Sequence, residues 1–436
     1  MMKMSINISI SDFAKIKKAN VKINGLTVIS GENDTGKSTV GKVVYSLIKS
    51  INTYKTSGVN VIKKSILEQM EDIIRLIGRL TIRKTKKFVE LRNQIFYYIP
   101  SPVLYDVDSL FSLDKREKYE ERIAKLEFEQ LSDIAKETND FAQKKQYWND
   151  SLLQDKINRL LYMLSFYQEE SKQLSVNLNL ELKASIGDVL INSLHPEDKG
   201  KISLSLKDKE ALSLDVTTEN LVVTKYNADD FEYIFDDATY IETPLLISEE
   251  FDLRFNKRSS YADILKKIKI AQNPKEKKLE YILQTIPGEI YMKNDKFSYK
   301  VSPKGKELSL SAMASGVKSF NILQLLAQGG FIGGVSKLLI VDEPENHLHP
   351  EWQLKYAELI VSLVAKGASI MLTSHSPYMI EALYYYAKQH LDENKVAFYY
   401  TEQTNIENYT EIKGTTDLSV IFDKLSKPLE KLVWNK

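Results

Sequence analysis

The first 50 residues change from a strand periodicity to a helix periodicity. Apolar and polar side chains alternate along two stretches, at Ile6, Ile8 and Ile10 and then at Val21 and Ile23. The apolar run 26–30 predicts a buried strand, and Val40, Val44 and Leu47 recur at the spacing of a helix. We therefore predict one α/β unit in which strands lead into a helix.

A long segment with a different pattern follows, over residues 58–192. It is rich in Lys, Glu and Leu and has almost no glycine. Apolar residues recur in it at helical spacing, first at Ile62, Ile66, Met70, Ile73, Ile77 and Leu80 and later at Leu153, Ile157, Leu160, Leu161 and Leu164. Neither series sustains heptads for the length of a coiled-coil arm. We predict a helical insert, a compact bundle or a short hairpin, interrupted near Pro100 and Pro102.

Strand periodicity returns after the insert. Alternation at 202–206, 212–216 and 221–223, with a turn at Glu219-Asn220, predicts an antiparallel β layer. A buried strand is expected at 238–241. Residues 289–300 indicate a hairpin around Asn294-Asp295, and from Ser309 the chain reads helix, strand, helix, strand. After Met379 we expect a helix, a strand at 396–400, a hairpin and a final helix.

These patterns divide the chain into four segments. Residues 1–57 and 301–436 are expected to be the two parts of one α/β domain, and 193–300 its β layer and connecting elements. The helical insert, 58–192, interrupts that domain. A chain of 436 residues with 43% hydrophobic residues has enough apolar surface for more than one core.

Composition excludes several classes of protein. The 60 basic and 59 acidic residues leave a net charge of +1, so binding to nucleic acid requires a local patch. Cysteine is absent, which removes disulfides, thiolate metal sites and a cysteine nucleophile. No apolar run is long enough to span a bilayer, and Met1 to Ser11 lacks a signal-peptide core. We expect a cytoplasmic protein that does not bind membranes.

The strand at 26–30 leads into a phosphate-binding loop, Gly31-Glu32-Asn33-Asp34-Thr35-Gly36-Lys37-Ser38. Its terminal glycines let backbone N–H groups converge on phosphate oxygens, and the helix opening at Lys37 directs its positive end at the same anion. Lys37 is expected to span the β- and γ-phosphates, and the Ser38 hydroxyl to bind Mg²⁺. Thr39 completes the predicted nucleotide contacts. Asp34 replaces a common third glycine but tolerates positive φ.

Candidate catalytic residues follow two later strands. The apolar run 337–341 ends in Asp342 and Glu343, which suits a buried parallel strand whose carboxyl end opens on a nucleotide. Asp342 would hold Mg²⁺ from its second shell, and Glu343 would orient and polarise the attacking water. The next strand, 368–373, precedes His375. One strand-helix-strand step separates His375 from Glu343, which would place its ring beside the same phosphate.

The order of these motifs resembles the ATP-binding-cassette (ABC) ATPases, and more narrowly the branch with RecF, the SMC proteins and the OLD-family ATPases. The resemblance rests on the phosphate loop, Met313 to Lys318, Asp342 to Glu345, Leu348 to Pro350 and Thr373 to Ser376. It covers roughly residues 1–50 and 300–385. It implies an α/β P-loop NTPase fold of ABC type, with an antiparallel β layer and a helical insertion, and ATP with Mg²⁺ as cofactor.

The resemblance also implies a site shared between two subunits. Ser315 and Gly316 occupy the family's signature motif, which caps the γ-phosphate bound to the opposite subunit. Lys318 replaces the family's glutamine, either as a cation acting on the other subunit or as a surface lysine. His349 stands in the dimer loop where many relatives have aspartate. We therefore expect a homodimer or a higher homo-oligomer.

The leading hypothesis is an ATP-hydrolysing, ATP-gated dimer that acts in DNA repair or defence against phage. A separate nuclease or toxin would be its effector, because the residues after Met379 are too few for the OLD-type nuclease domain. The alternative is a scaffold or sensor with slow turnover that holds a partner protein without DNA contact. A motor subunit of a membrane transporter is disfavoured by the long insert.

Some positions have two interpretations. Arg75, Arg79, Arg83 and Lys87 would form a basic helix face that contacts DNA, or a solvated face. His347, His349 and His375 would form a transition-metal site, or belong to the dimer loop and the phosphate site. The glutamine loop of the family corresponds to Gln94 or to Glu242-Thr243-Pro244. Phe13 would stack on adenine or pack in the core.

Overall fold

The structure, a computed structural model, describes the chain in fifteen stretches. These are residues 5–80, 85–98, 121–123, 125–143, 151–165, 170–186, 199–217, 220–242, 260–271, 289–293, 296–300, 307–309, 315–333, 336–405 and 409–434. The chain divides into two compact units, one formed by residues 1–52 with 178–436 and the other by 53–177. The insert predicted at 58–192 overlaps the second unit. None of the described helices is long and apolar enough to cross a membrane.

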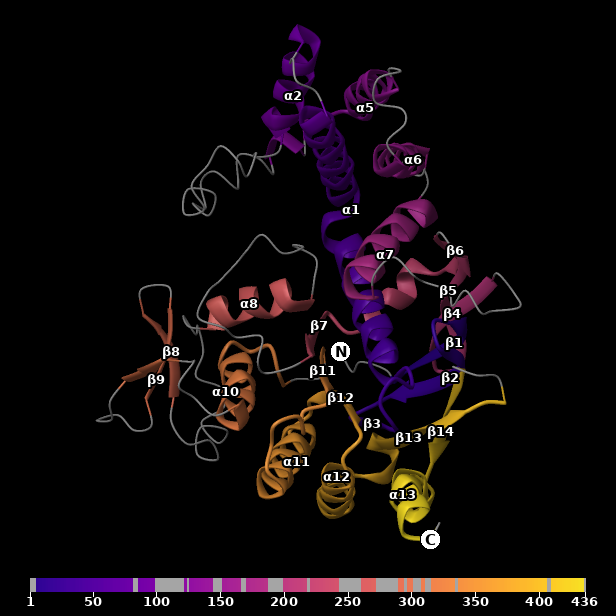
Figure 1. Cartoon of the computed structure of the whole chain (residues 1–436), viewed down its shortest axis with the longest axis vertical. Helices are drawn as coiled ribbons and strands as arrows, with labels where there is room; N and C mark the ends of the chain where they lie inside the picture. Colours follow the sequence, from indigo (N-terminus) through magenta and orange to yellow (C-terminus); the bar gives the residue numbers. More distant parts are fainter. Residues whose placement is uncertain are drawn as a thin grey trace. The chain divides into compact units, whose positions relative to one another are not determined.

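The first unit contains an eleven-stranded mixed sheet within the described residues (Figure 1). Its strand order is β6-β5-β4-β1-β2-β14-β13-β3-β12-β11-β7. The strands are β1 Ile6–Phe13, β2 Ile16–Ile23, β3 Leu26–Ser30, β4 Lys199–Leu206, β5 Lys209–Thr217, β6 Leu221–Tyr226, β7 Asp237–Ile241, β11 Lys337–Asp342, β12 Ser369–Ser374, β13 Val396–Gln403 and β14 Thr410–Thr415. Strands β13, β3, β12, β11 and β7 run parallel to their neighbours in that series, whereas β2, β1, β4, β5 and β6 pair antiparallel.

This arrangement confirms the α/β fold with an antiparallel β layer. A separate three-stranded sheet consists of β8 Glu289–Lys293, β9 Lys296–Lys300 and β10 Glu307–Ser309, and its β8–β9 pair is the predicted hairpin. The predicted turn positions Glu219, Asn294 and Asp295 lie outside the described residues. The expected order of helix, strand, helix and strand after Ser309 is also confirmed.

The helices of the first unit flank the parallel strands. They are α8 Ser260–Ala271, α10 Ser315–Gln328, α11 Pro350–Ala365, α12 Pro377–His390 and α13 Ser419–Trp434, with short 3₁₀ turns η1 Ala228–Tyr233 and η4 Glu393–Lys395. Helices α11 and α12 pack against each other (Figure 1). Both begin with proline at their first position, where a missing N–H is not needed. The side chains of His349 and Ser376 cap their first turns.

The core of the first unit surrounds the central parallel strands. Every residue of β3 is buried, and so are all residues after the first in β11 and β12. Strands buried on both faces read as continuous apolar runs, which is why the sequence reveals them without alternation. Phe13 is fully buried opposite Ile16 of β2, so it packs in the core and the adenine-stacking interpretation is not supported.

The second unit is helical. Helix α1 (Lys37–Leu80) and helix α7 (Glu170–Ile186) belong in part to each unit, and α2 (Lys86–Tyr98), α5 (Phe128–Ala142) and α6 (Ser151–Ser165) lie within the second. Helix α5 packs against both α2 and α6. The predicted interruption near Pro100 and Pro102 lies outside the described residues.

The predicted basic helix face requires a correction. Helix α1 ends at Leu80 and α2 begins at Lys86, so Arg75 and Lys87 belong to different helices. Arg75 is also paired within its own helix, because its Nε donates to Glu71 at 2.8 Å. Arg83 and the side chain of Arg79 lie outside the described part of the chain. The four-residue spacing therefore does not produce one continuous basic face.

Candidate nucleotide-binding site

Three loops meet at one edge of the sheet because three neighbouring strands are parallel. In the register of these strands Ser30 of β3 lies beside Ser374 of β12, and Thr373 lies beside Asp342 of β11. Gly31 N–H donates to the Ser374 carbonyl at 3.3 Å. The carboxyl ends of parallel strands are the usual place for a ligand in α/β proteins. The phosphate-loop motif, the Asp342-Glu343 pair and His375 therefore begin from the same edge.

The phosphate loop is supported by the strands β13 and β14. A Cβ added to Gly31 would lie 1.8 Å from Thr401 Oγ1 of β13, so only glycine fits at this position. Thr410 Oγ1 of β14 donates to the Thr35 carbonyl at 2.8 Å. Asp34 has φ 63°, which confirms that aspartate takes the left-handed conformation there, and it forms an ion pair with Lys15. A residue 375 positions later in the chain thus helps to shape the loop.

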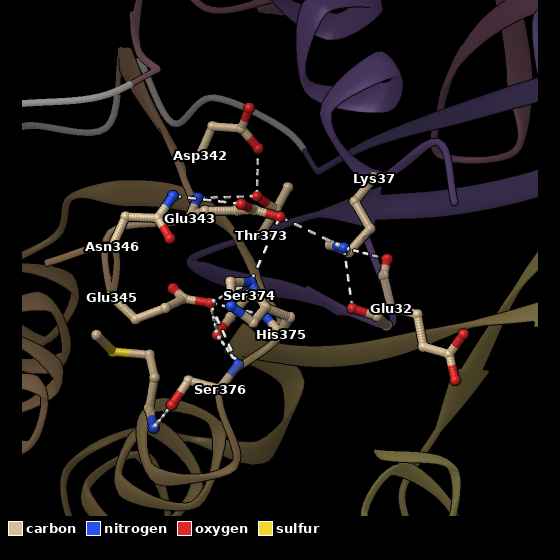
Figure 2. Close-up of polar contacts among 12 residues, drawn as sticks. Glu32, Lys37, Asp342, Glu343, Glu345, Asn346, Thr373, Ser374, His375 and Ser376 are labelled. Atoms are coloured by element: carbon tan, nitrogen blue, oxygen red, sulfur yellow. Dashed lines mark hydrogen bonds and ion pairs between the residues drawn. The ribbon is translucent and has the colours of Figure 1, made fainter. Parts of the chain in front are cut away.

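Lys37 is the first residue of α1 and its side chain is 2% exposed. Nζ donates to the carbonyls of Gly31 at 2.9 Å and of Glu32 at 2.5 Å, and it lies 3.5 Å from Glu343 Oε1 (Figure 2). Burial lowers the pKa of Lys37, whereas the nearby Glu343 carboxylate opposes that shift. The ammonium group is therefore held within the loop, where a phosphate oxygen would give it a stronger partner than a carbonyl.

Asp342 is the buried end of β11 and is surrounded by hydroxyl donors. Its Oδ1 accepts from Ser38 Oγ at 3.0 Å and from Thr373 Oγ1, and its Oδ2 accepts from Tyr240 OH at 2.8 Å. Burial raises the pKa of Asp342, and these hydrogen bonds oppose the rise. The hydroxyl and carboxylate oxygens of Ser38 and Asp342 are ligands of the kind that Mg²⁺ prefers. The two residues predicted to serve Mg²⁺ are thus in direct contact and fit that ion.

Tyr240→Phe is expected to weaken the apparent affinity for Mg²⁺, because Tyr240 orients the Asp342 carboxylate. The substitution removes one of three hydroxyl donors that orient the carboxylate and leaves the buried ring in place. The Mg²⁺ concentration for half-maximal ATP turnover should rise on the order of 10-fold, as for other residues behind a metal ligand. Tyr399→Phe is the matched control, because its hydroxyl accepts from Lys22 N–H at 2.8 Å and does not contact Asp342. An unchanged Mg²⁺ titration in the Tyr240 variant would contradict the role.

Glu343 is directed into the site by an unusual backbone conformation. Its φ is 47°, in the left-handed region, and its N–H donates to the carbonyl and the hydroxyl of Thr373, each at 3.1 Å. Its Oε1 lies 3.5 Å from Lys37 Nζ and 3.5 Å from His375 Nδ1. Asn346 Nδ2 donates to Oε2 at 3.3 Å. Glu343 therefore lies near both the predicted phosphate-binding lysine and the histidine predicted to lie beside the same phosphate.

Charge stabilises Glu343 and His375 in their ionised forms. The His375 side chain, with help from Lys37, lowers the pKa of Glu343 to about 2. Interaction with Glu343 and the charge of Glu345 raise the pKa of His375 against the effect of burial. Glu343 is thus a carboxylate at neutral pH, available to accept a proton or a hydrogen bond from water.

The residues of the predicted signature lie elsewhere in the same unit. Helix α10 begins at Ser315, so Gly316 is in its first turn, and a Cβ on Gly316 would lie 2.9 Å from Leu348 Cδ2. Lys318 is half-buried, and the Ser315 side chain lies outside the described atoms. The described contact of Gly316 is thus with the predicted dimer loop.

The histidines and the glutamine-loop candidates are separated by the fold. His349 accepts from Glu351 N–H at 3.4 Å as the cap of α11, and His347 is exposed. Within the described stretches no three His, Asp or Glu side chains are grouped to hold a metal ion. Gln94 is exposed on α2 of the second unit, whereas Glu242 follows β7, the neighbour of β11, and pairs with Lys42 at 2.8 Å. Thr243 and Pro244 lie outside the described residues.

Sequence reasoning missed several residues that complete this site. Tyr240, Thr373, Glu345, Thr401 and Thr410 are on strands or in loops that the pattern locates, but none belongs to a motif that assigns it a partner. Thr373 and Glu345 lie within the segments that carry the family resemblance, and that position was the available signal.

Comparisons with known proteins are consistent with this geometry. A family model described as the AAA ATPase domain matches residues 2–380. The Septu protein PtuA of Bacillus thuringiensis is 33% identical over 102 residues, which are 21% of this chain and 26% of that protein. The chain thus matches about a quarter of that relative's length.

Solved SMC head domains are also similar to this chain. The SMC head domain from Thermotoga maritima gives a TM-score of 0.39 at 10% identity, covering 95% of this chain and 100% of that one. An Smc head bound to the C-winged helix domain of ScpA gives 0.41 at 10% identity, covering 96% and 99%.

Proposed function

This chain belongs to the AAA ATPase domain family, and from that membership we propose that it hydrolyses ATP with Mg²⁺ at the edge of β3, β12 and β11. One observation supports this most strongly. Lys37, Glu343 and His375 come from three loops, and the Glu343 Oε1 atom lies 3.5 Å from Lys37 Nζ and 3.5 Å from His375 Nδ1. Such a cluster serves phosphoryl transfer, where positioning and charge stabilisation provide most of the catalysis.

Each residue has a defined task in this mechanism. Lys37 exchanges its loop carbonyls for the β- and γ-phosphate oxygens, while the amides of 31–38 bind the same anion. Ser38 and Asp342 would hold Mg²⁺, which supplies charge neutralisation on the phosphates. Glu343 orients the attacking water and accepts its proton, and His375 stays beside Glu343 and the γ-phosphate. The reaction needs no covalent intermediate.

We further infer that two copies close over ATP. The resemblance of Ser315, Gly316 and Lys318 to a signature motif supports this, and Gly316 lies close to Leu348, a residue of the predicted dimer loop. In the proposed dimer, the start of α10 from one subunit faces the phosphate loop of the other. A helix start offers unpaired N–H groups and the positive end of a dipole to the γ-phosphate.

ATP is expected to shift the Glu343→Gln variant from monomer to dimer in sedimentation velocity, because slow turnover keeps ATP bound. Adding Lys318→Glu should abolish the dimer, since it places a carboxylate opposite the γ-phosphate. Binding of a fluorescent ATP analogue should change by less than about 3-fold. Lys388→Glu, a charge reversal at an exposed position of α12, is the matched control and should still form the dimer. A dimer that persists with Lys318→Glu would favour the surface-lysine interpretation.

We propose defence against phage, or DNA repair, as the biological role, with a separate nuclease or toxin as effector. The motif resemblance supports both, and the similarity to Septu protein PtuA favours defence. Because Arg75 and Lys87 belong to different helices, the main argument for DNA contact through the second unit no longer applies. The alternative of a slow scaffold remains a second candidate because Val317 and Lys318 depart from the family's signature.

A further inference from the structure

A buried carboxylate joins two of the loops that form the site. Glu345 lies in the turn after β11, and its side chain is 3% exposed. Its Oε1 accepts from Ser374 Oγ at 2.8 Å, from His375 N–H at 2.7 Å and from Ser376 N–H at 3.2 Å (Figure 2). The three donors belong to the last residue of β12 and to the turn that follows it. One oxygen atom therefore holds the backbone on both sides of the His375 Cα.

The same turn is anchored on its other side. Ser376 Oγ donates to Gln353 Oε1 of α11 at 2.6 Å, and Gln353 Nε2 donates to the Leu348 carbonyl at 3.0 Å. Ser374 Oγ also accepts from Ser376 N–H at 3.1 Å. The network thus connects the His375 turn with both ends of the segment between β11 and α11.

The task of Glu345 differs from that of Glu343. Glu343 points to Lys37, whereas the hydrogen bonds of Glu345 go to the His375 turn, and His375 Nδ1 lies 3.2 Å from its Oε1 without a well-aligned hydrogen bond. A buried carboxylate is costly unless it is hydrogen-bonded, and burial raises the pKa of Glu345. Its position is explained if the turn requires a single strong acceptor.

We propose that Glu345 is a positioning residue, which fixes the turn 374–376 so that the His375 ring stays beside Glu343 during ATP hydrolysis. The inference rests on the proposed ATPase function. Two consecutive N–H groups that share one acceptor restrict the dihedral angles of the turn. Loss of that acceptor leaves the ring free to move away from Glu343, and a displacement of about 1 Å at a catalytic group can cost 100-fold in rate.

The acceptor, rather than the charge, is what this role requires. Oε1 makes all the hydrogen bonds, whereas Oε2 is buried and has no partner. Glutamine retains an oxygen at the Oε1 position and replaces only the unpartnered atom. Glu345→Gln should therefore keep kcat within about 3-fold of wild type, and Glu345→Ala should lower kcat about 10- to 100-fold. KM for ATP should change by less than about 3-fold in both, because Lys37 and the phosphate loop are untouched.

A double-mutant cycle on the full chain tests whether Glu345 acts through His375. Steady-state ATP hydrolysis is measured for wild type, Glu345→Ala, His375→Ala and the double variant, with Glu358→Ala, an exposed position of α11, as control. In the His375→Ala background, Glu345→Ala should lower kcat by less than about 2-fold, because its target is gone. Thermal unfolding and binding of a fluorescent ATP analogue establish that each variant is folded.

Three outcomes would overturn the inference. These are a wild-type kcat for Glu345→Ala, an equal loss for Glu345→Gln and Glu345→Ala, and the same loss in the presence and absence of His375. Failure of the proposed function looks different, because Glu343→Gln would then leave turnover unchanged as well. If Glu345→Ala does not fold, Ser376→Ala and the Gln variant replace it. Ser376→Ala removes the link to Gln353 and should lower kcat without raising KM, and an unchanged kcat would count against the network.

Discussion

Lys37→Ala is expected to lower ATP affinity by at least about 100-fold and to abolish turnover. The lysine is the cation of the phosphate loop, and a charge-assisted hydrogen bond to a phosphate is worth about 1.5–3 kcal/mol, so losing two of them accounts for a loss of this size. The measurement is equilibrium binding of a fluorescent ATP analogue with phosphate release in parallel. ATP-driven dimerisation should disappear in the same variant.

The thermal unfolding midpoint of Lys37→Ala distinguishes a specific loss of ATP binding from misfolding. Burial lowers the pKa of Lys37 below its unfolded value, so keeping this amine charged at neutral pH costs the fold some stability. Removing the amine relieves that cost, and the thermal unfolding midpoint of Lys37→Ala should not fall. Lys18→Ala, at an exposed position of β2, serves as the control for affinity. Undiminished ATP affinity in Lys37→Ala would exclude the loop as the binding site.

Glu343→Gln is expected to lower single-turnover hydrolysis about 100- to 1000-fold while ATP binding is retained. The pKa of about 2 makes Glu343 a carboxylate at neutral pH, and glutamine has the same shape without the negative charge. General-base catalysis of this kind contributes typically 10²- to 10⁴-fold. Glu351→Gln, on the exposed first turn of α11, is the control. The assay is phosphate release from enzyme in excess over ATP.

The same assay separates the two candidate functions. If wild type and Glu343→Gln hydrolyse ATP equally slowly while assembly still requires ATP, the catalytic role of Glu343 fails and the scaffold alternative stands. Glu343 also keeps the pKa of His375 raised, so this variant should bring the histidine pKa back toward its ordinary value. Proton NMR titration of the His375 ring would detect that change.

The second unit shows where local pattern was insufficient. The helical spacing of Arg75 to Lys87 is a property of sequence alone, and it predicts one face only if the helix continues. Helix α1 ends at Leu80, and α2 begins at Lys86. Arg75 already has a partner one turn earlier in Glu71, and it belongs to a different helix from Lys87.

The sequence by itself determined the elements and the local motifs. The buried runs of β3, β11 and β12, the start of α1 at Lys37, and the pairing of Asp342 with Glu343 depend on neighbours in the chain, so periodicity and spacing are enough to locate them. Even the positive φ of Asp34 follows from its residue type and its place in the loop.

Only the tertiary structure decided which distant side chains complete the site. Tyr240 reaches Asp342 across 102 residues, and Thr410 reaches the phosphate loop across 375. Those contacts depend on strand order and register, which place β7 beside β11 and β14 between β2 and β13. Strand order is set by the packing of the whole sheet, and no local pattern encodes it. Glu345 is the clearest case. Its carboxylate accepts from His375 N–H because β11 and β12 are neighbouring parallel strands, so the turns that follow them lie side by side.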